Sequence, residues 1–326
     1  MNLVLLIIFF LIIYILFKFN YYIESFGDYN IPDLKISNDI IIKLIQNNKP
    51  FMITRLGIGS ETQSTYKYSK NEKINKKNIN VLSNNAGIYD TNNDIKILEK
   101  YCGHYLDSIK NSSYMATWSI NSGIDQEQKY FIEKFNLKSV TTRVLEPFYI
   151  IDQNIKPWSN YLKNKKILII HPFINSFKIQ MKNKFKFFDK NNDFIFHPEQ
   201  EFIFYKSFNT AAGNHIHKNW LETFEIMCND IKNINFDVAL LGCGGYGLPL
   251  CNYIFKDLKK SSIYIGGGLQ LLFGVFGNRW QNNEFLIKRL RYDPNLIIQI
   301  PNPLLQNFEF NRKMIFLHPT FTSDEL

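Results

Sequence analysis

The sequence predicts an α/β fold in which a mostly parallel sheet is flanked by helices, as in Rossmann-like proteins. Short apolar runs alternate with segments of helical periodicity along most of the chain. Two of the apolar runs end in glycine clusters, at 242–247 and 266–268, where a backbone turns tightly or approaches a ligand closely. The 326 residues, 45% of them hydrophobic, suffice for the core of one large or two modest domains.

The first half of the domain covers residues 36–160. Apolar spacing predicts helices, with Ser37 or Asn38 capping the first, and apolar runs predict strands. The expected helices are 36–46, 93–110 and 126–135, and the expected strands are 51–55 and 114–118. A glycine-containing loop, 56–61, follows the first strand and leads into a further helix.

The second half covers residues 161–326. The expected strands are 167–170, 194–196, 202–205, 236–241 and 262–265. The expected helices are 220–231, 248–258 and a lysine-rich segment after His171. Because strands alternate with helices, most of the strands should run parallel. We expect the two halves to pack together as one unit.

The N-terminus predicts a single-pass membrane anchor over residues 1–23, followed by a stalk over 24–35. Residues 3–17 contain no polar side chain except Tyr14, and the apolar character continues to residue 23. There is no basic segment before the apolar stretch and no small-x-small cleavage site, which favours an uncleaved anchor over a signal peptide. The expected location is therefore a membrane, contacted through residues 3–23, with the orientation open.

The charge balance favours an anionic partner. The net charge is +9 and the pI is about 9.1. The lysines are scattered and form no stripe interleaved with aromatic residues, so we expect no nucleic-acid binding. The four cysteines have no metal-ligand spacing and are expected to be reduced and mostly buried.

Candidate site residues follow from the rule that ligands bind beyond the carboxyl ends of parallel strands. The rule selects 55–61, Thr117, Trp118, His171, 242–247 and 266–270. Arg55 ends a strand and has the geometry to hold a diphosphate, or to form an internal ion pair. Glu61 begins a helix and is a candidate metal ligand, general base or simple helix cap. His171 also ends a strand, as a candidate acid–base group or as an ordinary core histidine.

The glycine turns are a second group of candidates. We expect their backbone N–H groups to contact an anionic ligand. The candidates are Gly57, Gly242, Gly244, Gly247 and Gly267, with Gln270 beside them. A dinucleotide site would place Asp or Glu after the second strand of this unit, and Gly266, Gly267 and Gly268 stand there instead.

Three further polar residues are candidates for substrate binding. Glu146 lies in an apolar stretch and needs a partner if it is buried, either Arg143, Arg55 or a substrate. Asn85 belongs to a predicted turn whose carboxamides suit sugar hydroxyls. Arg279, beside Trp280, offers a cation and an aromatic plane, for a base, a sugar face or simple packing.

Several of these segments together resemble the GT-D-fold glycosyltransferases. The resemblance covers roughly residues 40–285, and the last block is its most specific part. Its segments are Arg55-Leu-Gly-Ile-Gly-Ser-Glu61, Asn84-Asn-Ala-Gly-Ile-Tyr, Leu145-Glu-Pro-Phe-Tyr, His171-Pro-Phe and 241–280. The resemblance implies a GT-D-like fold, a nucleotide-sugar donor, and a glycan, lipid or protein acceptor. It also implies an Asp-x-Glu element that binds a divalent cation, Mn or Mg, together with the donor diphosphate.

The sequence departs from this family in the first loop. Counting from Arg55, Ile58 and Ser60 occupy the acidic positions, and Glu61 stands one residue further on. Glu61 is therefore the one acid of this loop left to bind a metal. The departure leaves both metal dependence and catalysis open.

Three functions are compatible with these observations. The leading hypothesis is a membrane-anchored glycosyltransferase that transfers a sugar from a nucleotide-sugar donor. The second is an S-adenosylmethionine-dependent methyltransferase, suggested by Leu241-Gly-Cys-Gly-Gly-Tyr-Gly247 but lacking an acid after the next strand. The third is a non-catalytic module that binds a nucleotide or a glycan.

Overall fold

The computed structural model describes residues 32–74, 76–119, 122–151, 155–182, 195–197, 200–277, 280 and 298–300. The predicted anchor, residues 1–23, and the stalk up to residue 31 lie outside this part of the chain. Within the described ranges, no helix has the length and apolar character needed to cross a membrane.

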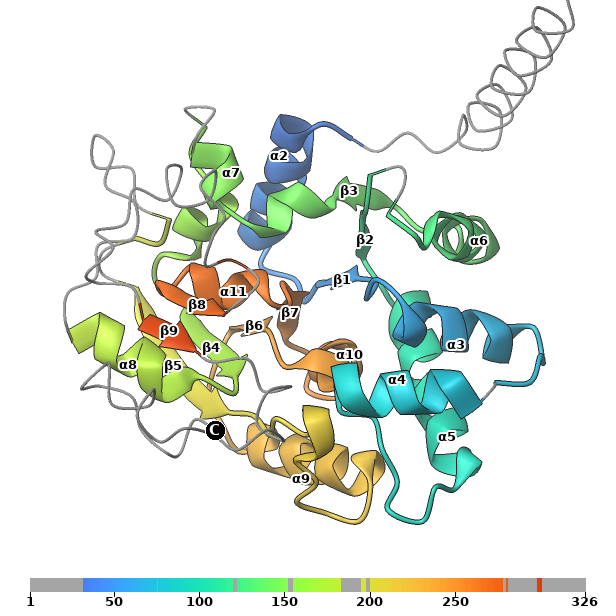
Figure 1. The fold of residues 1–326 in the computed structure, drawn as a ribbon. Helices are drawn as coiled ribbons and strands as arrows, with labels where there is room; N and C mark the ends of the chain where they lie inside the picture. Colours follow the sequence, from blue (N-terminus) through green and yellow to red (C-terminus); the bar gives the residue numbers. More distant parts are fainter. Residues whose placement is uncertain are drawn as a thin grey trace, which may run out of the picture.

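The centre of the fold is a seven-stranded sheet in which every pairing is parallel (Figure 1). Its order is β3–β2–β1–β7–β6–β4–β5. The strands are β1 Met52–Arg55, β2 Tyr114–Thr117, β3 Ser139–Thr141, β4 Lys166–His171, β5 Glu201–Lys206, β6 Val238–Leu241 and β7 Ser261–Tyr264. This confirms the predicted parallel α/β architecture.

The two halves of the chain share this sheet. Strand β1, from the first half, pairs with β2 on one side and with β7, from the second half, on the other. Ile53 is the register residue on both sides, opposite Tyr114 and Ile263. A smaller pairing joins β8 Val275–Gly277 to β9 Ile298–Ile300.

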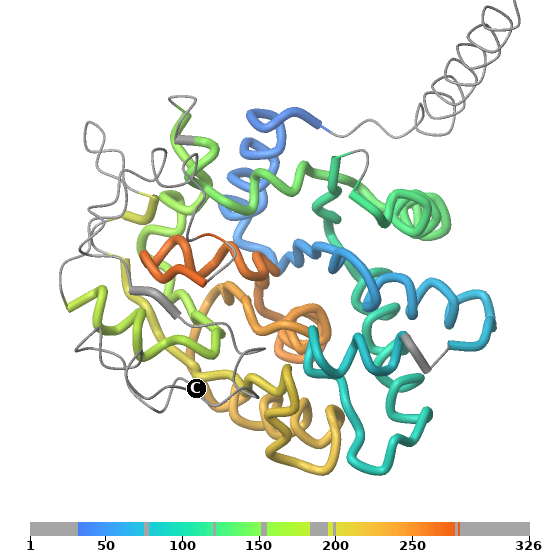
Figure 2. Tube along the Cα trace, viewed as in Figure 1, coloured from blue at the N-terminus to red at the C-terminus, as the bar shows by residue number. Residues whose placement is uncertain are grey.

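Helices cover both faces of the sheet (Figures 1 and 2). The α-helices are α2 Leu34–Gln46, α3 Ser60–Ser69, α4 Lys76–Ala86, α5 Ile95–Lys110, α6 Asp125–Phe135, α7 Phe148–Ile151, α8 Ile174–Lys182, α9 Trp220–Lys232, α10 Gly247–Lys256 and α11 Gly268–Leu271. Short 3-10 helices are η1 Thr142–Leu145, η2 Trp158–Leu162, η3 Ala211–Gly213 and η4 Gly244–Tyr246.

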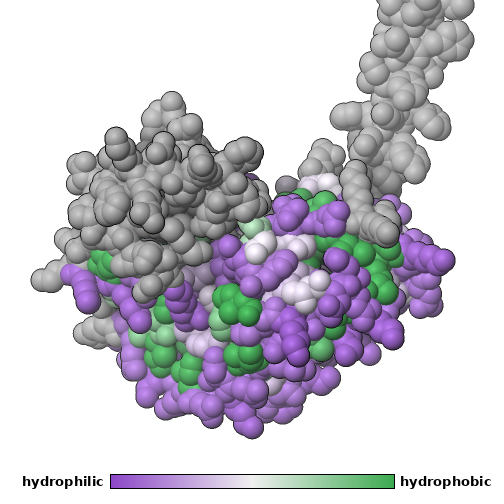
Figure 3. Space-filling model, turned by 60° about the horizontal axis from the view of Figure 1, so that its bottom comes forward, coloured by the Kyte–Doolittle hydropathy of each residue, from purple (hydrophilic) through white to green (hydrophobic). Residues whose placement is uncertain are grey.

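Alternation along the strands builds a core on each face of the sheet. In β4, Ile167 and Ile169 join the cluster that includes α2 and α8, whereas Leu168 and Ile170 join the cluster with α5, α9 and α10. All four are completely buried, as expected for a central parallel strand. The face seen in Figure 3 is largely hydrophilic, with separate apolar patches.

The start of α2 differs from the prediction. Asp33 caps the helix, because its Oδ1 accepts from the N–H of Ile36 at 2.6 Å. Ser37 and Asn38 lie inside the helix and are buried. The Oδ1 of Asn38 accepts from the N–H of Trp158 at 2.8 Å, so this residue joins distant segments instead of capping a helix.

Three other local predictions were incomplete or wrong. Helix α4 and the three-residue strand β3 were not predicted. Asn84 and Asn85, expected in a turn, lie in the last turn of α4. Residues 195–196 lie in a bend, whereas the strand predicted at 202–205 forms as β5.

Candidate functional site

The carboxyl ends of β1 and β7 lie side by side near the middle of the sheet. From β1 the chain continues to β2 and β3 on one side, while β7, β6 and β4 lie on the other side. In open parallel sheets, ligands bind beyond the carboxyl ends of the strands. The last residue of β1 is Arg55, and Gly266 follows the end of β7.

Arg55 is a largely enclosed cation. Its Cζ lies 5.1 Å from the ring centroid of Trp118 and 5.5 Å from that of Tyr264. Its Nε is buried and has no hydrogen-bond partner. Across the described part of the chain, no carboxylate oxygen lies within the 4.0 Å of its guanidinium that defines an ion pair. The expected internal ion pair is therefore absent there.

The backbone of Gly266 makes room for this guanidinium. A Cβ at this position would lie 2.0 Å from Nη2 of Arg55, and the φ of Gly266 is +72°. Only glycine satisfies both the contact and the backbone conformation without strain. The glycine cluster after β7 thus shapes the surroundings of Arg55.

Glu61 lies beside Arg55, in the first turn of α3. Gly57 leaves room for its carboxylate, since a Cβ there would lie 2.4 Å from Oε2. The hydroxyl of Tyr101 donates to Oε1 at 3.4 Å. The loop is fixed by Tyr105, whose hydroxyl accepts from the N–H of Gly57 at 2.8 Å. Glu61 is half-buried, and it does not serve as the N-cap of α3, which is Gly59.

The surroundings of Glu61 change its acidity. Burial raises the pKa of the Glu61 carboxyl above its ordinary value of 4.5, while the charge of Arg55 and the hydrogen bond from Tyr101 oppose the rise. Burial and the nearby charge of Glu61 also raise the pKa of Tyr101 well above its usual value, so this phenol stays a hydrogen-bond donor. A carboxylate with a raised pKa is suited to accept a proton.

Glu146 approaches the same glycine cluster from η1. A Cβ on Gly268 would lie 2.4 Å from its Oε1. Its other oxygen, Oε2, lies 3.7 Å from Nη1 of the exposed Arg143. Arg55 therefore lies against Gly266, and Glu146 lies against Gly268. The two glycines belong to the same turn. The predicted need of Glu146 for a charged partner is met by Arg143.

The turn after β6 is packed against protein. A Cβ on Gly242 would lie 2.7 Å from the carbonyl oxygen of Gly266, and one on Gly247 would lie 2.1 Å from Cε2 of Tyr264. The N–H of Gly242 donates to Ile170 at 2.9 Å. Packing therefore explains these two glycines, whereas Gly244, with φ +55°, is exposed.

His171 is 2% exposed at the end of β4. Its Nδ1 accepts from the N–H of Phe173 at 3.1 Å, and its ring lies 4.8 Å from that of Phe177. These contacts hold the start of α8 against the sheet. They support the interpretation of His171 as a core histidine.

The remaining candidates are spread over different surroundings. Gln270 is buried, and its Nε2 donates to the carbonyl of Val275 at 3.2 Å, which holds the turn before β8. Asn85 is exposed on α4, and Gly267 is half-buried before α11. Arg279 lies outside the described residues.

Two aromatic residues of the site were missed by sequence reasoning. Tyr264 lies under Arg55 and donates to the carbonyl of Gly244 at 3.1 Å, so it joins the two glycine turns. Tyr101, on α5, contacts Glu61 from a helix that carries no motif. The one available signal was the position of Tyr264 directly before the glycine cluster. Trp118 was identified by the strand-end rule, and its Nε1 donates to the carbonyl of Leu56 at 2.8 Å.

The described residues do not fit a resident divalent-cation site. They include no group of three or more His, Cys, Asp or Glu side chains arranged to hold a metal. In the first loop, Ile58 is 55% exposed, and Glu61 is the one acid of residues 56–61.

The fold and site define an α/β protein in which the cation Arg55 lies beside two aromatic rings at the carboxyl edge of a parallel sheet. No protein-family model and no curated protein matches the sequence. Two solved structures are similar to the fold. One is a selenomethionine-substituted domain of unknown function 1792, with a TM-score of 0.41 and 14% identity, covering 76% of this chain and 81% of that chain. The other, a glycosyltransferase of that domain type from Streptococcus sanguinis, has a TM-score of 0.39 and 10% identity, covering 73% and 81%. The function proposed below depends on the residues of this chain's own site.

Proposed function

We propose that the protein is a glycosyltransferase that uses a nucleotide-sugar donor and is anchored to a membrane by residues 3–23. The observation that carries this proposal is Arg55. It is a cation at the carboxyl edge of the sheet, with an unpartnered Nε and no carboxylate within ion-pair distance among the described residues. A diphosphate offers it two charged oxygens in the geometry that a guanidinium binds best.

The neighbours of Arg55 hold it in place for such a donor. The ring centroids of Trp118 and Tyr264 lie 5.1 and 5.5 Å from its Cζ. The absence of a side chain at Gly266 lets the guanidinium lie against the backbone after β7. A partly buried guanidinium attracts a phosphate more strongly than one in bulk water.

Glu61 is the proposed general base. In the reaction, the oxygen of the acceptor hydroxyl bonds to the anomeric carbon, and the bond from that carbon to the donor's phosphate oxygen breaks. The hydroxyl proton passes to the Glu61 carboxylate, and the electron pair of the broken bond leaves with the nucleoside diphosphate. Arg55 stabilises the charge that develops there. No step uses a metal ion, because the described residues do not fit one.

The test is donor binding and turnover by the full chain. Nucleotide-diphosphate sugars are screened by thermal shift, and the best donor is titrated by calorimetry and followed for sugar release. Arg55→Ala should weaken binding by at least about tenfold, equivalent to ~1.4 kcal/mol. Arg55→Lys should restore only part of the affinity, because a lysine cannot make the paired contact.

Lys110→Ala is the matched control, since it removes one positive charge at the end of α5, before β2 and away from the site. It should leave donor affinity unchanged. Binding without sugar release by the wild type would mean a non-catalytic nucleotide- or glycan-binding module. If no nucleotide sugar binds, or if the Arg55 and Lys110 variants bind alike, the proposed function is wrong.

A further inference from the structure

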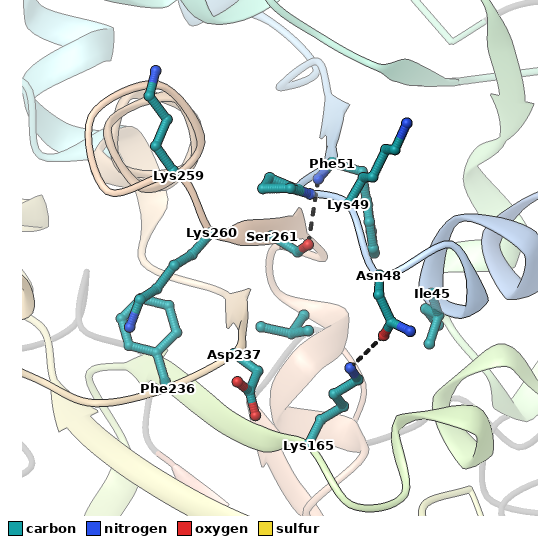
Figure 4. A pocket seen from close by; sticks show the side chains of 12 residues that line it. Ile45, Asn48, Lys49, Phe51, Lys165, Phe236, Asp237, Lys259, Lys260 and Ser261 are labelled. Atoms are coloured by element: carbon teal, nitrogen blue, oxygen red, sulfur yellow. Dashed lines mark hydrogen bonds between the residues drawn. The ribbon is translucent and has the colours of Figure 1, made fainter.

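A second pocket lies at the opposite edge of the sheet, where the strands begin. It has a volume of about 210 Å³, and its lining comes from the ends of α2 and α10 and the starts of β1, β4, β6 and β7 (Figure 4). Because β4 is six residues long, the two edges of the sheet are roughly 20 Å apart. This pocket is therefore separate from the site around Arg55.

The lining is strongly basic. It contains four lysines, Lys49, Lys165, Lys259 and Lys260, and a single carboxylate, that of Asp237. Within the described ranges, none of these ammonium groups lies within 4.0 Å of a carboxylate. Asp237 is instead bound to the backbone, because its Oδ2 accepts from the N–H of Lys166 at 2.7 Å. The lining therefore carries an excess of positive charge.

Two of the lysines are held in place by their neighbours. The Nζ of Lys165 donates to Oδ1 of Asn48 at 2.6 Å, and the Nζ of Lys260 lies 4.2 Å from the ring centroid of Phe236. Burial lowers the pKa of Lys260, and Asp237 opposes this shift. In Figure 4, Lys49 and Lys259 extend outward from the rim. The ammonium groups point in different directions in this view, and the flexible four-carbon stem of lysine lets them turn toward a bound anion.

The backbone at the rim is an independent observation. Lys259 has φ +55°, a left-handed conformation, two residues after the C-cap of α10. Glycine or asparagine takes this conformation more easily than lysine. A glycine at position 259 would therefore keep the same backbone with less strain.

We propose that this pocket at the amino edge of the sheet binds a phosphate or diphosphate group through Lys165 and Lys260, with Lys49 and Lys259 closing on it from the rim. Lysine is a compact point charge that binds phosphate oxygens without a fixed fork geometry. The hydroxyl of Ser261 also lines the pocket, where it accepts from the N–H of Phe51 at 3.3 Å and is free to donate its own proton. The group belongs either to a soluble phosphate ester or to an anionic lipid headgroup.

The first arm of the test uses inorganic pyrophosphate and the full chain. Calorimetry is carried out in an Arg55→Ala background, which removes the cation of the opposite edge. Lys165→Ala/Lys260→Ala should weaken pyrophosphate binding by at least tenfold. Lys96→Ala/Lys100→Ala, which removes two exposed charges from α5, is the matched control and should change it less than twofold. The proposal would be overturned if the two double variants lose pyrophosphate affinity equally, or if the parent does not bind pyrophosphate at all.

The second arm separates binding from folding. Lys259→Gly relieves the left-handed backbone, so its melting temperature should equal or exceed that of the parent, while its pyrophosphate affinity falls severalfold. If Lys259→Gly binds pyrophosphate as tightly as its parent, Lys259 does not contribute to binding, and the proposal is contradicted.

The third arm identifies the source of the phosphate. The full chain is reconstituted in phosphatidylcholine nanodiscs with and without phosphatidylglycerol, and pyrophosphate competition is measured. If phosphatidylglycerol weakens pyrophosphate binding in the parent but not in Lys165→Ala/Lys260→Ala, the ligand is a lipid headgroup. If it has no effect while pyrophosphate still binds, the ligand is a soluble ester. Both results support the anion pocket, and both are independent of donor binding at Arg55.

Discussion

The guanidinium of Arg55 rests against the backbone of Gly266, and a Cβ on that glycine would lie 2.0 Å from Nη2. The two residues come from neighbouring strands of the sheet, β1 and β7, and from opposite halves of the chain. The position of the cation therefore depends on a residue more than two hundred positions away.

Gly266→Ala should displace Arg55 without changing any charge. The φ of +72° costs an alanine roughly 1–2 kcal/mol, and the contact with Arg55 adds to this. Donor affinity should fall about as far as in Arg55→Ala, as measured by calorimetry. Gly123→Ala is the control, because Gly123 has φ +85° but nothing within 4 Å of its added Cβ. Gly123→Ala should lower stability and leave donor affinity unchanged. If Gly266→Ala also binds the donor with normal affinity, Gly266 is not needed for the function of Arg55.

Glu61 should cost the folded protein stability at neutral pH. Its pKa is raised by burial, so the folded state binds more protons than the unfolded state as the pH rises from 4.5 through the raised value. Stability linked to this group is complete below pH 4.5 and is lost as the pH rises through the folded pKa. Glu61→Gln should therefore raise the melting temperature at pH 7.

The gain in Glu61→Gln should disappear below pH 4, where both side chains are neutral. The same variant should lose turnover but keep donor binding, because the amide cannot accept the proton. Turnover of the wild type should rise with pH through a pKa above 4.5, which is the acidic limb that a general base gives. A stabilised Glu61→Gln with normal turnover would assign the base to another group.

Much of the site could be predicted from the sequence because parallel strands end at one edge. Arg55, Glu61 and Trp118 were found by that rule, and they do lie together. The rule does not say whether the space beside a glycine is filled by a ligand or by another part of the protein. Gly242 and Gly247 were assigned to a ligand, yet their missing side chains make room for Gly266 and Tyr264, contacts that no local pattern encodes.

The same limit applies to elements that depend on tertiary contacts. Asn38 is a residue typical of helix caps, but its side chain is used by Trp158, which lies 120 positions away. Helix α4 has four asparagines in eleven residues, which are weak helix formers, so its sequence favoured a turn. Strand β3 has three residues and is defined by its pairing with β2.

A divalent cation should have little effect on donor binding. Across the described part of the chain no group of three potential metal ligands occurs, and Arg55 supplies the charge that a metal would otherwise give to the diphosphate. The donor dissociation constant measured with Mn²⁺ and with excess EDTA should differ by less than about threefold, or ~0.7 kcal/mol. Donor binding that requires Mn²⁺ and is lost in Glu61→Gln would mean that Glu61 binds a metal after all.

His171 should prove structural and not catalytic. Its Nδ1 accepts the N–H of Phe173 and its ring packs on Phe177, with 2% of its surface exposed. His171→Asn keeps an acceptor near Nδ1 but leaves a gap beside Phe177, so it should destabilise the fold by about 1–3 kcal/mol. Turnover, normalised to the folded fraction, should stay within about threefold of the wild type. A threefold change is equivalent to ~0.7 kcal/mol, which is too small for the loss of a catalytic acid or base. The pH profile of turnover should keep the same acidic limb. A folded His171→Asn that binds donor normally but turns over a hundredfold more slowly would move the proton-transfer role from Glu61 to His171.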